Sequence, residues 1–244
     1  MRKVIMLLIP ALFCFVGAAR SAPITGAQIQ TWTYDADTKI VTVRVVNTSP
    51  QPITAYVLFV KAGGSEWRTL QDFLSARAFH EKLRGFGLSE EQIAQVQFGP
   101  EAIPVGGYYD QQVSVAGLGF KDFFAAIEAV TFENNSMEAV NSTASTWITD
   151  SRKSAANAIE KANTIILASS DHDTAAKEID KAIAVDEATP HTSYDLSTAG
   201  LSTIAYDLRN TGKRISLKDF AASKEKERQI WLSGAKLKIA GGAQ

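Results

Sequence analysis

The chain of 244 residues carries 25 basic and 26 acidic side chains, and 45% of its residues are hydrophobic. A chain with this balance can bury one or two cores, which excludes a disordered or collagen-like protein. Its one cysteine, Cys14, excludes a fold held together by intramolecular disulfides.

The first residues have the layout of a secretory signal peptide. Arg2 and Lys3 precede an uncharged run over residues 4–19, and small residues follow. Pro10 interrupts the run, which is shorter than the roughly 20 residues that span a bilayer. We therefore expect residues 1–21 to be cleaved off after Ser21, giving a secreted or periplasmic protein; the alternative is an uncleaved anchor.

Cleavage after Ser21 would remove three basic residues and the only thiol. Residues 22–244 keep 22 basic and 26 acidic side chains, a net charge of −4. Without Cys14 there is no cysteine nucleophile, zinc–thiolate site or redox chemistry. Because no later stretch is long and apolar enough to span a membrane, we expect the mature chain to be soluble and not transmembrane.

Residues 22–136 carry the signals of a β-sheet domain. Runs rich in β-branched and aromatic residues alternate with turn clusters, which predicts strands. In the second run Val41, Val43 and Val45 alternate with Thr42 and Arg44, as in a sheet with one buried and one solvated face. The predicted strands are 27–34, 39–47, 53–61, 108–115 and 127–133, and the third, apolar on both faces, is expected to be central.

A helical insert is predicted within this domain, over about residues 67–97. Ser89 and Gln92 have the spacing of a capping box, flanked by the hydrophobic staple pair Leu88 and Ile93. The preceding apolar residues recur at helical spacing. They are Leu70, Phe73, Leu74 and Ala78.

Two segments carry a resemblance to a known kind of module. The sequence VRVVNTSPQPITAY of residues 43–56 and the sequence AVTFE of residues 129–133 resemble strands of immunoglobulin-like or fibronectin-like modules in exported bacterial proteins of unknown function. The resemblance implies an immunoglobulin-like antiparallel β-sandwich, a module without catalytic residues of its own. The missing cysteine pair and the helical insert depart from that pattern.

Residues 137–244 are predicted to be helical, which makes the whole chain α+β. Apolar stripes at spacings of three and four predict three helices, and capping signals predict a fourth, as a bundle or as helical hairpins. Asp171 to Asp173 caps the second helix, whereas Ser216 and Asp219 cap the fourth. The stripes are Trp147, Ile148, Ala155, Ile159, Ala162, Ile165 and Ile166; then Ala175, Ile179, Ala182 and Ile183; then Leu201, Ile204 and Leu208. The fourth helix is predicted from its capping pair and from the hydrophobic staple of Ile215 and Phe220.

Charge is divided unevenly within this helical region. Residues 208–238 hold nine basic and three acidic side chains, whereas residues 133–207 hold five basic and twelve acidic ones. Either the two segments neutralise each other, or basic residues including Arg214 and Lys218 bind an anionic surface such as phosphate head groups or an acidic polysaccharide. Nucleic acid is not expected, because aromatic residues are not interleaved with the charges. The stretch 224–228 is polar on all sides, typical of exposed helix.

No motif predicts catalysis, a metal or a cofactor. The three histidines, His80, His172 and His191, lack the spacing of a helix-borne metal site. The acidic residues beside His172 are explained by helix capping, and Asp35 and Asp37 by a hairpin turn. Nucleophile elbows, phosphate-binding loops and dinucleotide fingerprints are missing as well.

Aromatic residues give the remaining hint of binding. With regular alternation along the first strand, Trp32 and Tyr34 share a face with Gln28 and Gln30, opposite Ile29. A solvated face of this kind, with Tyr108 as a further aromatic residue, would suit sugars or an extended peptide; the alternative is that the inserted helices cover it. The candidate binding residues are therefore Trp32, Tyr34, Tyr108, Arg214 and Lys218.

The sequence thus favours an exported, non-catalytic interaction or structural protein of the cell envelope. Its expected partner is an envelope protein or a polysaccharide. One alternative is a hydrolase that acts on an envelope polymer through carboxylates the sequence does not locate. Another is a protein that binds a membrane surface through its basic C-terminal helix.

Overall fold

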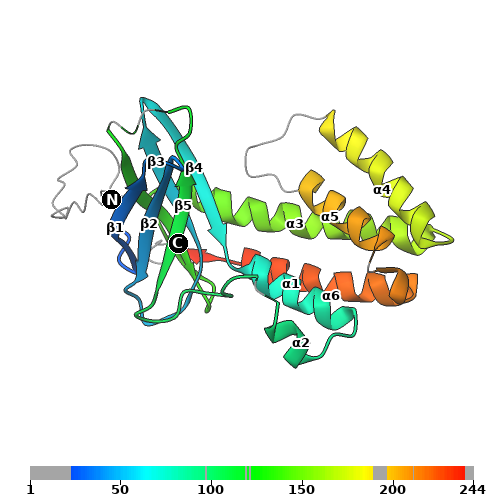
Figure 1. Cartoon of the computed structure of the whole chain (residues 1–244). Helices are drawn as coiled ribbons and strands as arrows, with labels where there is room; N and C mark the ends of the chain where they lie inside the picture. Colours follow the sequence, from blue (N-terminus) through cyan, green and yellow to red (C-terminus); the bar gives the residue numbers. More distant parts are fainter. Residues whose placement is uncertain are drawn as a thin grey trace. The chain divides into compact units, whose positions relative to one another are not determined.

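The computed structural model describes residues 23–239, apart from residues 97, 119, 121, 189–196 and 211 (Figure 1). The signal-peptide prediction and His191 lie outside the described residues. The chain forms two compact units, and its α+β class is confirmed. Among the described residues, the sheet unit contains residues 23–72, 102–145 and 237–239; the helical unit contains those of segments 73–101 and 146–236.

The sheet unit contains two β-sheets. One has the strand order β1-β2-β5 and the other the order β4-β3-β6-β7-β8, and neighbours are antiparallel except the parallel pair β7 and β8. The strands are β1 (Ala27–Asp35), β2 (Ile40–Asn47), β3 (Ile53–Ala62), β4 (Ser65–Asp72), β5 (Tyr108–Ser114), β6 (Phe124–Phe132), β7 (Ser136–Ala139) and β8 (Lys238–Ile239).

The inner faces of the two sheets meet in a core. Val41, Val43 and Val45 of β2 are fully buried, which confirms the alternation predicted for this strand. From the opposite sheet, the buried Tyr56 hydroxyl donates a hydrogen bond of 2.7 Å to Oε1 of Gln111 on β5. Burial raises the pKa of Tyr56. The bond therefore satisfies two polar groups inside an apolar core.

The predicted helical insert begins too early. Residues 65–72 form β4, which pairs antiparallel with β3, and the first helix starts only at Leu74. The turn between the strands is Gly63-Gly64, and both glycines have positive φ values, of 56° and 82°. A two-residue turn of this kind closes a hairpin because its twist matches that of the strands. The helical spacing of Leu70 and Phe73 was thus coincidental.

The helical unit has its own hydrophobic core. Side chains from α3, α4, α5 and α6 build it, among them the fully buried Ile166, Ile179, Leu208 and Phe220. All three residues of the stripe Leu201, Ile204 and Leu208 are buried, as expected. The helices are α1 (Leu74–Gly85), α2 (Glu90–Ala94), α3 (Ser142–Ala168), α4 (His172–Glu187), α5 (Ser197–Arg209) and α6 (Leu217–Ala235), with a 3-10 turn η1 (Gly212–Arg214) before α6.

The inserted helices belong to the helical unit rather than to the sheet domain in which they were predicted. Helices α1 and α6 lie side by side (Figure 1). A Cβ atom on Gly85 would lie 1.7 Å from Oγ of Ser223, and one on Gly234 would lie 2.2 Å from Cδ1 of Leu74. The start of α1 thus meets the end of α6, so the two helices are antiparallel.

Three predicted helix caps are confirmed. Ser89 and Gln92 form the capping box of α2, Asp171 caps α4, and the hydroxyl of Ser216 accepts a hydrogen bond from the Asp219 amide at the start of α6. Each cap satisfies amide groups that have no partner within the helix. The local polar pattern therefore locates these helix starts correctly.

Candidate functional site

A cavity of about 270 Å³ lies within the helical unit, among α1, α3, α5 and α6. Small-molecule sites in proteins typically have a few hundred Å³, so this one suits a small ligand. Every described residue that lines the cavity belongs to the helical unit.

Helical spacing brings the lining side chains together. On α6, Lys224, Glu227 and Trp231 follow one another at spacings of three and four. On α1, Phe79 and Lys82 are three residues apart. Residues at these spacings share one face of a helix, so α1 and α6 each turn a single face toward the cavity.

Aromatic and small residues form the apolar walls. The rings of Phe79 and Phe98 are stacked with 4.2 Å between their centroids, and Phe98 remains 46% exposed. Opposite walls come from α3 and α5, where a Cβ atom on Gly200 would lie 3.0 Å from that of Ala158. This close approach depends on a glycine at position 200. The other apolar or small lining residues include Ala155, Ile159, Ala199 and Ile204.

Four charged side chains form a cluster at this cavity, which we call the charged cluster: Lys82, Asp207, Lys224 and Glu227. Nζ of Lys224, with a side chain only 1% exposed, lies 3.1 Å from Oδ2 of Asp207 and 2.8 Å from Oε1 of Glu227. Nζ of Lys82 lies 3.1 Å from the other Asp207 oxygen. Both lysines and Glu227 line the cavity. Burial of these charges is tolerated because they are paired.

The charged cluster keeps unused hydrogen-bonding capacity. An ammonium group has three N–H donors. Toward the described residues, Lys224 uses two of its donors and Lys82 uses one, and Oε2 of Glu227 accepts no hydrogen bond. The ammonium of Lys82 also lies 4.8 Å from the centroid of the Phe79 ring. The cavity therefore combines apolar walls with spare polar groups on a few charged residues.

Burial raises the pKa of Glu227, although Lys224 and Lys82 act in the opposite direction. Removing a carboxylate from water disfavours its charged form. Glu227 therefore takes up a proton at a higher pH than an exposed glutamate does, and its protonated form can donate a hydrogen bond.

Burial also corrects the expectation that residues 224–228 are an exposed stretch of helix. Lys224 and Glu227 are buried within the helical unit.

Comparisons with protein-family models, with curated proteins and with solved structures found no match. The proposed function therefore rests on the chemistry of the described residues.

The predicted face of Trp32 and Tyr34 is wrong. A β-bulge interrupts β1 between Ile29 and Thr31, so that Trp32 pairs with the buried Val43 and Tyr34 with Val41. One extra residue shifts the following side chains to the opposite face of a strand. Trp32 and Tyr34 therefore share the inner face of the sheet, whereas Gln28 and Gln30 are exposed.

Half-buried aromatic rings pack around this pair. The Tyr34 ring is stacked on Phe120 with 4.0 Å between centroids, and Trp32 packs edge-on against Phe120 and Phe123. Both phenylalanines lie between β5 and β6, within the sheet unit. In the structure, residues of this connection contact Trp32.

Tyr108 lies on the outer face of its sheet and is 57% exposed. The guanidinium of Arg44 lies 3.9 Å from the ring centroid of Tyr108 and forms two hydrogen bonds of 2.7 Å with Asp110. These bonds lower the pKa of Asp110. Tyr108 is thus apart from Trp32 and Tyr34, on the opposite face of the same sheet.

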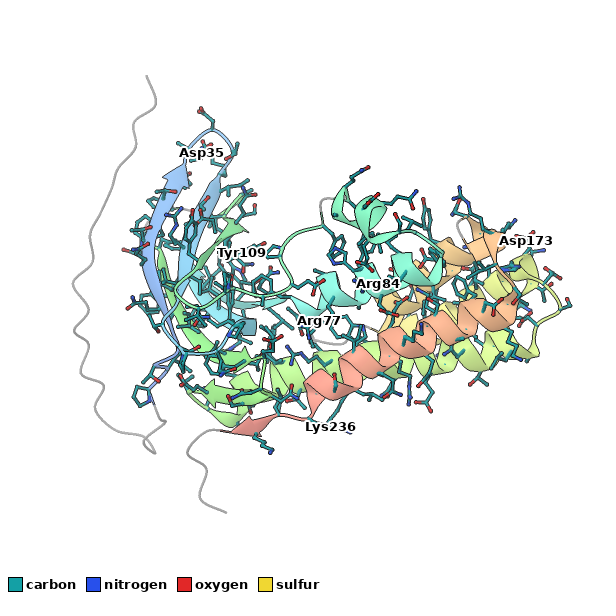
Figure 2. The ribbon with its side chains drawn as sticks, turned by 90° about the horizontal axis from the view of Figure 1, so that it is seen from below. Asp35, Arg77, Arg84, Tyr109, Asp173 and Lys236 are labelled. Atoms are coloured by element: carbon teal, nitrogen blue, oxygen red, sulfur yellow. The ribbon has the colours of Figure 1, made fainter. Side chains whose placement is uncertain are left out.

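Arg214 and Lys218 are exposed, and toward the described residues neither forms an ion pair. Several other basic residues of segment 208–238 pair with acidic residues of segment 133–207, as the neutralisation alternative expects. The pairs are Arg209 with Asp180, Lys213 with Asp173, Lys224 with Asp207 and Arg228 with Glu160. Asp173 lies at the start of α4 (Figure 2).

The acidic residues Asp171 and Asp35 have the structural roles predicted for them. Asp171 caps α4, and Oδ1 of Asp35 accepts a hydrogen bond of 2.9 Å from the Asp37 amide in the turn after β1 (Figure 2). Over the described part of the chain, no group of three histidine, cysteine or acidic residues is placed to hold a metal ion. Among those same residues, no helix has the length and hydrophobicity to cross a bilayer.

Sequence reasoning missed the cavity entirely. Its residues come from four helices that are distant in the sequence and, with Phe98, from the segment after α2, and none carries a recognisable motif. A signal was present in the helix pattern, because Lys224 and Glu227 share a face with Trp231. That combination is compatible both with an exposed helix and with a paired, buried one.

Proposed function

We propose that this chain is an exported, non-catalytic binding protein of the cell envelope, whose helical unit binds a small apolar molecule. The cavity in the helical unit carries the proposal. Apolar and aromatic walls with a few charged groups are the usual composition of a small-molecule site.

The sheet unit fits this role as a structural or interaction module. We propose that it is an immunoglobulin-like sandwich, on the basis of its two sheets and the core formed between them. Export rests on the layout of residues 1–21. The intact mass of the protein recovered outside the cytosol should correspond to residues 22–244.

A neutral fluorescent probe tests the cavity directly. N-phenyl-1-naphthylamine is uncharged, and its emission increases in apolar surroundings. We expect saturable binding of one probe molecule per chain, with energy transfer from Trp231, which lines the cavity. Absence of saturable binding by the full chain would contradict the proposal.

Two tryptophan substitutions on α5 provide a matched pair. Ala199 is exposed and lines the cavity, whereas Ser202 is exposed and does not line it. We expect Ala199→Trp to weaken probe binding at least about tenfold by filling the cavity. Ser202→Trp adds the same side chain to the same helix and should leave binding unchanged. Equal affinities in the two variants would place the probe elsewhere.

A hydrolase acting on an envelope polymer remains the second candidate. The observation in its favour is that Asp207 and Glu227 both bind Lys224, so two carboxylates converge in one cluster at the cavity. Hydrolysis of purified envelope polymer that Glu227→Gln abolishes would support this candidate. An apolar cavity offers few partners to the many hydroxyl groups of a polysaccharide, which favours the binding role.

A further inference from the structure

We infer that the cavity takes an apolar molecule that ends in a carboxylate group, and that Lys82 and Lys224 hold this carboxylate. The inference rests on the proposed function and adds the chemical class of the ligand. The lysines line the same cavity as the aromatic side chains of Phe79, Phe98 and Trp231. One molecule can therefore contact both groups.

The hydrogen-bond inventory of the charged cluster favours a ligand that accepts several bonds. Toward the described residues, Lys82 and Lys224 together have three unused N–H donors, whereas Glu227 has one unused oxygen. A carboxylate accepts hydrogen bonds on two oxygens and can engage more than one donor at a time. An alcohol satisfies fewer of these donors.

The charges of the cluster also favour a ligand carboxylate. Both oxygens of Asp207 are already occupied by the two lysines, so Glu227 is the one acidic residue of the cluster that lines the cavity. A ligand ammonium group would approach two lysine ammonium groups and be repelled. A ligand carboxylate would form charge-assisted hydrogen bonds, which are strengthened by the apolar surroundings.

Glu227 couples this binding to pH. The charged groups around it are Lys224 on its own helix, Lys82 on α1 and Asp207 on α5. When ionised, Glu227 repels a ligand carboxylate, whereas its protonated form donates a hydrogen bond to it. Binding of the anion therefore favours proton uptake by Glu227, so the affinity should fall as the pH rises through the raised pKa of Glu227.

Three molecules with ten carbon atoms each and different end groups separate the possibilities. Decanoate, decanol and decylamine are each titrated against the full chain, with displacement of N-phenyl-1-naphthylamine as the readout. We expect decanoate to bind at least about tenfold more tightly than decanol at pH 6, and decylamine to bind most weakly.

Two variants test the residues. Lys82→Met removes one ammonium group and should weaken decanoate binding about tenfold, and decanol binding much less. Lys218→Met, on the exposed surface of α6, is the matched control and should change neither. Glu227→Gln should strengthen decanoate binding at pH 9 and remove its pH dependence. Lys224 is left intact, because its loss would leave two buried carboxylates without their partner.

The outcomes distinguish this inference from the proposed function. If the neutral probe binds but decanoate and decanol displace it equally well, the carboxylate assignment is wrong and the cavity remains an apolar site. Tightest binding by decylamine would also overturn the assignment and would make Glu227 the anchor. If the neutral probe itself does not bind, the proposed function fails.

Discussion

At the scale of single residues, Asp171 shows how one carboxylate orders a helix start. Its Oδ1 accepts a hydrogen bond of 2.8 Å from the Thr174 amide, and its Oδ2 accepts bonds of 2.8 Å from the hydroxyls of Thr174 and Ser170. These hydrogen bonds lower the pKa of Asp171 to about 2, and the hydrogen bond from the Thr174 amide has the largest effect. The ionised form is therefore the one that caps α4.

The shifted pKa of Asp171 predicts a pH dependence of stability. Because the folded-state pKa lies below the ordinary value of 3.8, the stabilisation is complete above about pH 4 and is lost as the pH falls through 2. Asn also caps helices but does not titrate, so Asp171→Asn should lose less stability than the wild type between pH 4 and pH 2. Urea unfolding followed by circular dichroism measures the difference; parallel curves for the two proteins would contradict it.

Two residue-scale errors show where sequence reasoning stops. Regular alternation placed Trp32 beside Gln30, but the bulge between Ile29 and Thr31 moves Trp32 to the inner face. The polar stretch at Lys224 was expected to be exposed, but acidic partners from α5 and α6 allow its burial. Both outcomes depend on neighbours that the local pattern does not contain, namely the partner strand and the partner helix.

At the scale of elements, the pairing of α1 with α6 depends on small residues. Gly85 meets Ser223, and Gly234 meets Leu74, and on each helix the two contacts are eleven positions apart. Eleven residues correspond to about three helical turns, so the two glycines mark the same line of contact at its two ends. Lys226 and Glu81, whose charged atoms are 3.6 Å apart, lie between these ends.

Substitution of Gly234 tests this close approach. Gly234→Ala would place a methyl group 2.2 Å from Cδ1 of Leu74, and overpacking of this kind costs about 1–3 kcal/mol, more than the helix preference of alanine returns. Leu74→Ala alone should cost about 2–5 kcal/mol because it empties a buried site.

The double variant Gly234→Ala/Leu74→Ala shows whether the clash with Leu74 causes the loss of stability, because the shortened side chain at position 74 makes room for the added methyl group. It should lose at least about 1 kcal/mol less than the sum of the single variants, measured by urea unfolding. Ser202→Ala, on the exposed side of α5, serves as a control and should change the free energy of unfolding little. Strict additivity of the two single effects would show that Gly234 is not tightly packed against Leu74.

Helices and strands were predicted with uneven success for a physical reason. Caps at Ser89, Asp171 and Ser216 were found because capping is a local interaction between neighbouring residues. The strand β4 was missed because apolar residues there also fit a helical period, and the deciding signal was the two-glycine turn at residues 63–64. When a short segment fits both the helical and the strand period, the turn residues at its ends have to decide between the two structures.

At the scale of the whole molecule, each unit is assembled from segments that are distant in the sequence. The helical unit combines residues 73–101 with residues 146–236, whereas the sequence predicted a boundary near residue 136 and placed the insert with the strands. Composition reveals helices but not their partners, because partner choice depends on complementary surfaces such as Gly85 against Ser223. The cavity is likewise built from segments that are distant in the sequence, because Phe79 and Lys82 come from the insert.

A rearranged helical unit tests whether this assembly is self-contained. The start of α1 meets the end of α6 at Leu74 and Gly234, so a short glycine–serine linker can join residue 236 to residue 73. A protein with the order 146–236, linker, 73–101 should be helical, unfold cooperatively on heating and bind N-phenyl-1-naphthylamine. The fragment 146–236 alone lacks Phe79 and Lys82 and loses the helix that covers α6, so it should bind no probe and melt at a lower temperature. The two proteins differ only in the linker and in residues 73–101, which contain α1 and α2. Equal probe binding and equal melting temperatures would therefore show that residues 73–101 are dispensable for the helical unit.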